Sequence, residues 1–217
     1  MTPPGKSSRR PRPGSGSETK GRARALRLPP ALGFLGEFLR EPFKIGAICP
    51  SSATLARVVA DACDIRPGAT VVELGPGTGP FTGPLLRRLG NHGRLVAVEL
   101  NPRNSEVLRE RFPRCEVVQD SAEHLARHLS PGCADCIVSG LAWGNMLPRT
   151  QDAILDAILR TLSPTGQFVA FGYLHAAWFP TSLGFRRRLQ RHFPLVETTP
   201  IVWRNLPPAF VFRCSRG

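Results

Sequence analysis

Apolar residues along most of this chain recur in short runs that alternate with helical patterns. The runs predict strands at 70–74, 95–99, 116–118, 136–139 and 167–171. Between them, apolar positions spaced three and four residues apart predict helices at 81–89, 103–111, 121–129 and 148–162. Strands that alternate with helices form parallel sheets, because each parallel connection needs a crossover. The body of the chain is therefore predicted to be α/β.

The pattern changes near the C-terminal end. After Phe193 two further strands are predicted, at 196–202 and 209–213, joined by the turn residues of 205–208. Seven strands that end in a hairpin differ from the six strands of the dinucleotide-binding fold. We therefore predict a seven-stranded, doubly wound, Rossmann-like sheet.

The N-terminal part has a different composition. Residues 1–27 are rich in Pro, Gly, Ser and Arg and have almost no large apolar side chains, so they are predicted to be disordered. From Pro29 apolar residues return at helical spacing and stop before Pro42, which predicts a short amphipathic helix. We expect a basic tail at 1–27 and one folded domain at 28–217 that begins with this helix.

Charge and cysteine usage narrow the choice of partner and compartment. The formal net charge of +13 favours a polyanionic partner, either nucleic acid or an anionic membrane surface. The six cysteines follow no secretory leader, so we expect free thiols in the cytoplasm. Cys133 and Cys136 have Cys-x-x-Cys spacing, but no second ligand pair accompanies them, and we expect no metal. No apolar run approaches the ~20 residues of a membrane-spanning helix, so any membrane contact is expected to be peripheral.

A glycine-rich turn directly follows the first predicted strand. The segment 71–79 reads Val-Val-Glu-Leu-Gly-Pro-Gly-Thr-Gly, which lets a ligand lie against bare backbone near a helix N-terminus. In a dinucleotide loop the third glycine would come one residue later, so the spacing argues against NAD. Glu73 precedes the loop and can accept hydrogen bonds near the ammonium group of a bound cofactor.

Acids end the next two predicted strands. Glu99 ends the second strand, where an acid can bind both ribose hydroxyls, and Asp120 follows the third strand, where it can accept from the adenine amino group. Three acids at three successive strand ends form a nucleoside site. The sequence therefore predicts S-adenosylmethionine binding at Glu73, Gly75, Gly77, Thr78, Gly79, Glu99, Asp120, Ser121 and Ser139.

Four stretches of the chain resemble a known family. They are residues 38–52, 72–79, 138–141 and 203–209. They are similar to the bacterial phospholipid N-methyltransferases, which convert phosphatidylethanolamine toward phosphatidylcholine. The resemblance implies the methyltransferase form of the seven-stranded sheet and S-adenosylmethionine as methyl donor. It also implies an enzyme bound peripherally to the inner face of the membrane, with its N-terminal helix in contact with anionic lipid.

The substrate side is predicted from aromatic residues and from the resemblance. Aromatic faces attract ammonium groups, and the one tyrosine and all three tryptophans lie in the C-terminal half. We expect the phospholipid at Ser51, Ser52, Trp143, Trp203, Arg204 and Asn205. Tyr173 and His175 are the candidate catalytic residues, because His175 could take a proton from the substrate amine. Each of these rings could instead belong to the core.

Two other functions stay open. Ribosomal RNA adenine N6-methyltransferases have a very similar glycine loop and suit a basic protein. They carry Asn-Pro-Pro-aromatic after the fourth strand, whereas residues 139–143 of this chain read Ser-Gly-Leu-Ala-Trp. The chain thus lacks the amide and the prolines that clamp a base, although nucleic acid remains a second partner class. The other alternative is a catalytically silent cofactor-binding protein that works through its basic tail.

Overall fold

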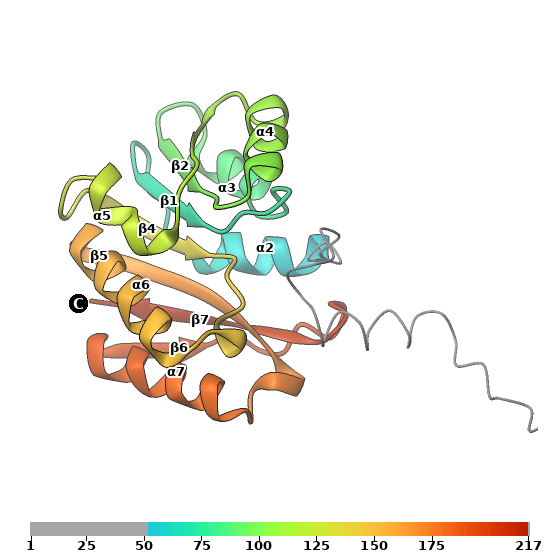
Figure 1. Cartoon of the computed structure of the whole chain (residues 1–217). Helices are drawn as coiled ribbons and strands as arrows, with labels where there is room; N and C mark the ends of the chain where they lie inside the picture. Colours follow the sequence, from blue (N-terminus) through green and yellow to red (C-terminus); the bar gives the residue numbers. More distant parts are fainter. Residues whose placement is uncertain (1–51, 217) are drawn as a thin grey trace, which may run out of the picture. The chain divides into compact units, whose positions relative to one another are not determined.

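Seven strands form one sheet, as predicted, and the sheet is mixed with the order β3-β2-β1-β4-β5-β7-β6 (Figure 1). This computed structural model describes residues 52–216, so the tail at 1–27, the predicted helix between Pro29 and Pro42 and the boundary between tail and domain lie outside the described residues. The strands are β1 (Thr70–Leu74), β2 (Arg94–Val98), β3 (Cys115–Val118), β4 (Ala134–Ser139), β5 (Leu162–Tyr173), β6 (Leu195–Thr198) and β7 (Ala209–Ser215). Only β7 runs antiparallel to its neighbours, β5 and β6.

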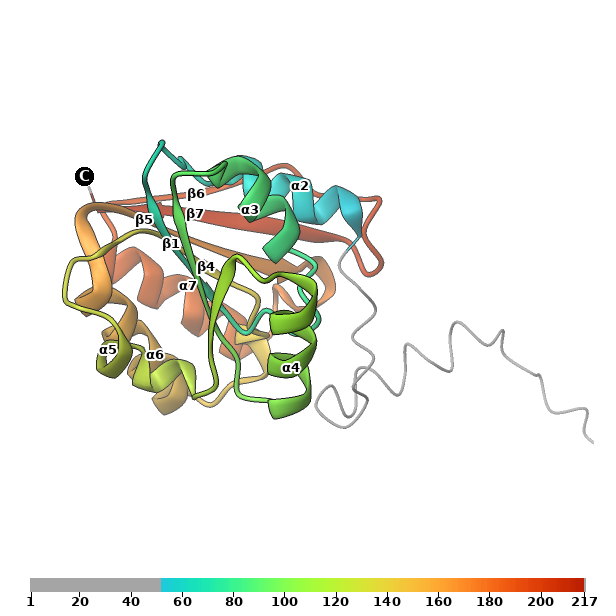
Figure 2. The same ribbon diagram turned by 90° about the horizontal axis from the view of Figure 1, so that it is seen from above.

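Helices cover both faces of the sheet (Figure 2). They are α2 (Ala53–Ala62), α3 (Thr82–Leu89), α4 (Pro102–Arg111), α5 (Leu125–His128), α6 (Pro148–Thr161) and α7 (Pro180–His192), with short 3-10 turns η1 (Ala122–His124), η2 (Trp143–Asn145) and η3 (Leu174–Ala176). The helices α2 and α3 pack on one face, and α5, α6 and α7 pack on the other. Parallel strands buried on both faces read as continuous apolar runs, which explains why the strand pattern was visible in the sequence. Among residues 52–216, no helix is long and apolar enough to cross a bilayer.

The chain reverses direction across the sheet between β1 and β4. The first crossovers lead from β1 to β2 and β3, and the chain then returns to form β4 on the other side of β1. The loops after β1 and β4 meet there, since the Gly140 amide donates to the Leu74 carbonyl at 2.8 Å. A Cβ atom at Gly140 would lie only 2.5 Å from the Gly75 carbonyl oxygen, so the two backbones pack directly against each other. Doubly wound sheets bind their ligands at such a switch point.

Three elements differ from the sequence prediction. The helix predicted at 121–129 is divided into η1 and α5. The helix α7 was not among the predicted helices, because few of its residues are apolar and only Phe185 and Leu189 are buried. The strand β6 ends at Thr198 instead of 202, and Val202 forms only an isolated bridge to Ala209. Pro200 has no amide hydrogen for a ladder bond, which is consistent with this early end.

Candidate active site

The glycine loop connects β1 to α3 and has the backbone form that its sequence predicts. Gly75, Gly77 and Gly79 have φ angles of 63°, 59° and 86°, a left-handed region that other residues rarely adopt. A Cβ atom at Gly75 would lie 2.4 Å from the Leu141 side chain, and one at Gly79 would lie 2.4 Å from the Phe112 ring. Conformation and close packing therefore both require glycine at these two positions.

Glu99 lies directly after β2 and holds the glycine loop. Its Oε2 accepts a hydrogen bond from the Gly77 amide and its Oε1 accepts one from the Asn101 amide, both at 2.8 Å. The side chain is buried, but each carboxylate oxygen has a second lone pair. Glu99 can therefore fix the loop and still accept from the two hydroxyls of a ribose.

Glu73 lies in β1 below the loop and is completely buried. Its Oε2 accepts a hydrogen bond from the Thr82 hydroxyl at 2.7 Å, while its Oε1 has no partner among the described residues. Burial raises the pKa of Glu73 to about 8, and the nearby charge of Glu99 adds to the rise against the opposing Thr82 hydrogen bond. A buried acceptor with an unused oxygen fits a cationic ligand group, such as the ammonium of S-adenosylmethionine.

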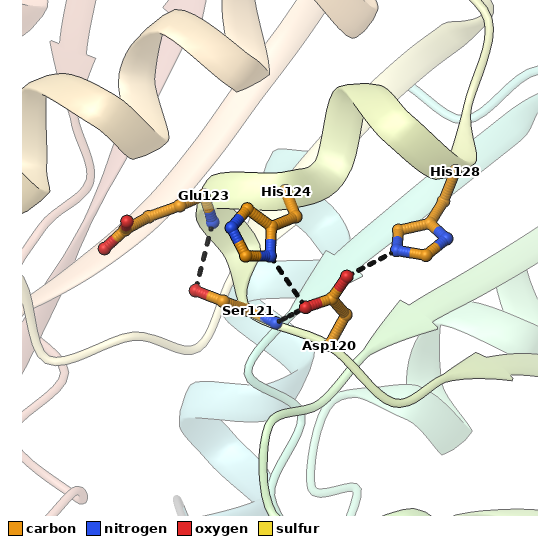
Figure 3. Close-up of polar contacts among 5 residues, drawn as sticks. All are labelled: Asp120, Ser121, Glu123, His124 and His128. Atoms are coloured by element: carbon orange, nitrogen blue, oxygen red, sulfur yellow. Dashed lines mark hydrogen bonds and ion pairs between the residues drawn. The ribbon is translucent and has the colours of Figure 1, made fainter.

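Asp120 follows β3 and pairs with two histidines (Figure 3). Its Oδ1 accepts from the Ser121 amide at 2.7 Å and lies 2.8 Å from Nδ1 of His124, while its Oδ2 lies 2.7 Å from Nε2 of His128. The hydrogen bonds from His128 and His124, in that order of size, hold the pKa of Asp120 well below its usual range. The carboxylate thus stays charged and already has three partners, so its predicted bond to an adenine amino group would be an additional one.

Ser139 and Trp143 form a buried pair after β4. The Trp143 Nε1 donates to the Ser139 Oγ at 2.9 Å, and the Leu141 amide donates to the same oxygen at 3.3 Å. The Trp143 ring is only 3 % exposed and stacks on Phe185, with ring centroids 4.2 Å apart. The ring is therefore part of the core, and its burial does not support the prediction that Trp143 binds substrate.

Asn205 and Ser52, which were both predicted to bind substrate, make hydrogen bonds that support the fold. Asn205 is buried, its Oδ1 accepts from the Ser52 amide at 2.9 Å, and its Nδ2 donates to the Pro207 carbonyl at 2.7 Å. The Ser52 hydroxyl accepts from the Leu55 amide and so caps α2. These bonds attach the start of α2 to the turn before β7. Ser51 lies outside the described residues.

Trp203 and Arg204, in contrast, are exposed on the same turn. Both line a hollow of about 560 Å³ between α2 and residues 199–204. None of the predicted cofactor residues lines this hollow. The two side chains therefore remain accessible to a ligand, as their predicted role requires.

Tyr173 and His175, the candidate catalytic residues, lie together where β5 ends. Their rings stack with centroids 5.7 Å apart, and the Tyr173 ring also makes an edge contact with Phe171 at 5.3 Å. Partial burial lowers the pKa of His175, which favours a neutral imidazole near pH 7. A neutral imidazole can accept a proton, so the position and charge state are compatible with a general base.

Several functional contacts were not foreseen from the sequence. Thr82 supports Glu73, Asn101 supports Glu99, and His128 completes the Asp120 cluster. The spacing of Asp120, His124 and His128 at intervals of four residues was a usable signal for the last of these. The supports of the two glutamates had no such signal, since they depend on how the loops fold.

Cys133 and Cys136 do not converge. The Cys136 side chain is buried on the face of the sheet that α2 and α3 cover, whereas Cys133 packs against the core of the other face. Alternate residues of a strand point to opposite faces, and the two thiols are directed apart accordingly. Within residues 52–216, no group of three His, Cys, Asp or Glu side chains is arranged to hold a metal ion.

Sequence comparisons connect this chain to methyltransferases. A family model described as a methyltransferase domain matches residues 71–166. Ornithine lipid N-methyltransferase of Singulisphaera acidiphila is 30% identical over 187 residues, a match that covers 83% of this chain and 93% of that protein. The chain belongs to the lipid N-methyltransferase family. It is thus a class I enzyme that transfers methyl groups from S-adenosylmethionine to nitrogen.

Two further comparisons bear on the fold and on the alternatives. TrmN from Thermus thermophilus has a TM-score of 0.61 at 21% identity, covering 82% of this chain and 52% of that one, which shows a shared fold. Ribosomal RNA small subunit methyltransferase A of Geobacter metallireducens is 48% identical, but over only 67 residues that cover 30% of this chain and 23% of that enzyme. The similarity to this RNA enzyme is therefore local, whereas the similarity to the lipid enzyme spans the domain.

Proposed function

We propose that this N-methyltransferase acts on the amine of a phospholipid headgroup, converting phosphatidylethanolamine toward phosphatidylcholine. The observation that carries the proposal is the extent of the match to a lipid N-methyltransferase, which includes 93% of that protein. A match of this length extends past the cofactor half into the C-terminal half, where methyltransferases differ according to substrate. An RNA enzyme that matches only 23% of its own length gives no such support.

The cofactor half supplies binding and orientation. Glu73 would hold the ammonium group, Glu99 the ribose hydroxyls, and the glycine loop would lie against the rest of the cofactor. Bound S-adenosylmethionine supplies an electrophilic methyl group. Because this donor is already reactive, the protein contributes mainly proximity and alignment of the amine.

The substrate half would prepare the amine for attack. An amine must be neutral to act as a nucleophile, and the neutral imidazole of His175 can take its proton. The stacked ring of Tyr173 fixes the orientation of that imidazole. Trp203 offers an exposed aromatic face for a methylated ammonium product, and Arg204 offers a cation for the lipid phosphate.

The proposal includes a peripheral position on an anionic membrane surface at the inner face. Support comes from the exposed cations and from a substrate that resides in the bilayer. The enzyme would then act on lipid without extracting it fully into water.

The deciding experiment is incubation of the purified protein with labelled S-adenosylmethionine and each candidate substrate. Vesicles containing phosphatidylethanolamine should gain label that co-migrates with its methylated derivatives in thin-layer analysis. Ornithine lipid and ribosomal RNA are tested in parallel, with the Glu99→Ala variant as a cofactor-site control. Label in RNA with none in lipid amines would overturn the proposal, and label confined to ornithine lipid would change the substrate.

A further inference from the structure

Large exposed apolar side chains collect at one edge of the sheet, the edge formed by the carboxyl ends of the parallel strands. Six of them form what we call the apolar rim: Leu147, Trp178, Phe179, Leu183, Trp203 and Leu206. They lie in the loop after β4, in the loop and first turn of α7 after β5, and in the turn between β6 and β7. Trp178, Trp203 and Leu206 are 79 %, 69 % and 70 % exposed, far more than packing residues are.

Hydrogen bonds connect the three loops of the rim into one platform. The Leu174 amide donates to the Pro208 carbonyl at 2.9 Å, which joins the loop after β5 to the β6–β7 turn. The Thr181 hydroxyl donates to the Gly144 carbonyl. The side-chain amide of Gln151 donates to the backbone carbonyls of Trp143, after β4, and of Thr181, at the start of α7. Figure 1 shows the three loops at the same end of the sheet. The rim side chains are thus presented together instead of independently.

The charge of the same loops has one sign. Segments 141–149, 174–187 and 199–208 contain no Asp or Glu, but they contain the exposed cations Arg149, Arg186, Arg187 and Arg204. Aromatic and aliphatic side chains surrounded by cations suit the boundary between headgroups and acyl chains of an anionic bilayer. A protein partner would need an apolar patch surrounded by acidic side chains, in a shape that matches these loops. An anionic bilayer offers acyl chains below negatively charged headgroups and needs no matching shape.

We propose that the apolar rim inserts into the surface of an anionic bilayer and faces the active site toward the membrane. This inference rests on the proposed function for its choice of partner, and it assigns the contact to the catalytic domain itself. Trp178, Phe179 and their neighbours would enter the interface while the four arginines bind lipid phosphates. A lipid amine would then meet the carboxyl edge, where Tyr173 and His175 lie, without leaving the bilayer.

The test measures binding of the full chain to vesicles of phosphatidylcholine and phosphatidylglycerol by co-sedimentation. These vesicles contain no methylatable amine, so the result does not depend on turnover. The Trp178→Ser/Phe179→Ser variant should bind on the order of tenfold more weakly, since it lacks two large side chains that would be partly buried in the bilayer. The matched control is Leu195→Ser, because Leu195 is 50 % exposed at the opposite edge of the sheet.

The arginines have an equivalent pair of variants. Arg186→Gln/Arg187→Gln should reduce binding and flatten its dependence on phosphatidylglycerol content and salt. Arg160→Gln is the control, since Arg160 is exposed in the last turn of α6, away from the rim. Equal losses in rim and control variants would overturn the proposal, because a nonspecific effect would then explain both.

A second measurement keeps the test valid if the rim variant does not fold. In the Trp203→Phe protein, Trp178 is the exposed tryptophan and Trp143 is the buried one. Its fluorescence should shift to shorter wavelength when vesicles are added, as an indole leaves water. An unchanged spectrum with bound vesicles would overturn the insertion. A dimer in sedimentation that the rim variant breaks, with vesicle binding unchanged, would instead assign the rim to a second copy of the chain.

Failure of the membrane inference and failure of the proposed function are distinguishable. Methylation of detergent-dispersed phosphatidylethanolamine by a rim variant that no longer binds vesicles would support both. Rim-dependent vesicle binding without methylation of any lipid amine would leave the membrane inference standing and remove the substrate assignment. If rim variants bind vesicles normally and the protein methylates phosphatidylethanolamine in them, the substrate assignment stands and the membrane inference falls.

Discussion

The two halves of the carboxyl edge are built differently. In the half formed by β1, β2 and β3, buried or partly buried acids accept hydrogen bonds from the residues that follow the strands, as Glu99 does from the Gly77 amide. In the half formed by β4, β5 and β6, the loops expose large apolar side chains and arginines, such as Trp178 and Arg204. The first half suits a small polar ligand of fixed shape, and the second suits an extended surface. The same sheet edge thus carries two kinds of recognition.

The largest expected effect tests whether Trp143, in the loop after β4, belongs to the core instead of the exposed surface. Trp143→Ala should lower the free energy of unfolding by ~3–5 kcal/mol, because the ring is a buried core residue. Chemical denaturation measures the change. A folded variant of normal stability that loses only activity toward lipid would contradict the core assignment and restore the predicted substrate role.

The next largest effect is expected from removal of Glu99, which holds the glycine loop in the cofactor half. It should affect cofactor binding and leave the exposed half unchanged. Glu99→Ala should weaken binding of S-adenosylmethionine by about 100-fold, since charge-assisted bonds to ribose are lost and the Gly77 amide loses its acceptor. Calorimetry measures it, with Glu99→Gln as a variant of similar shape. Vesicle binding should not change, and unchanged cofactor affinity would remove Glu99 from the site.

A pH dependence follows from the pKa of Glu73. The unfolded carboxyl releases its proton near 4.5, whereas the folded one retains it to about 8. The native state therefore binds more protons in this window, and the free energy of unfolding of the cofactor-free protein should fall as pH rises from 4.5 to 8. Denaturation across this range measures the slope, which Glu73→Gln should remove.

The same group predicts proton release on cofactor binding. An ammonium beside Glu73 favours the carboxylate, so affinity should rise with pH, by at most about tenfold per unit, and become level above the raised pKa. Calorimetry at pH 7 in buffers of different ionisation enthalpy would count the proton. Binding without proton release would place the ammonium elsewhere.

The smallest effect concerns Asp120. Because its carboxylate already has three partners, Asp120→Asn should weaken cofactor binding only a few-fold, on the order of one hydrogen bond. His128→Gln, which leaves the carboxylate in place, is the matched control. A loss as large as that for Glu99→Ala would show that the acid contacts the adenine group directly.

The glycine loop and the acids at the ends of the first three strands could be located from the sequence, whereas the surroundings of the predicted substrate residues could not. Gly75 and Glu99 follow apolar runs at fixed spacing, and a parallel sheet places all such strand ends at one edge. Trp143 was assigned to substrate because it is aromatic, and Asn205 because its segment resembles the phospholipid N-methyltransferases. The structure instead buries both, since each side chain has a hydrogen-bond partner inside the protein. The type of a residue does not reveal whether its side chain faces outward. In an irregular loop, buried positions do not recur at a regular spacing, so they cannot be predicted from the sequence pattern.

The sequence by itself determined the succession of strands, the glycine loop and the positions of the acids after it, because these depend on local spacing. Only the tertiary structure decided which distant residues meet. It brought Thr82 to Glu73 and joined the loops after β4, β5 and β6 into one rim. Those contacts depend on the packing of loops from separate strands, and the positions of these loops are fixed only when the whole sheet has formed.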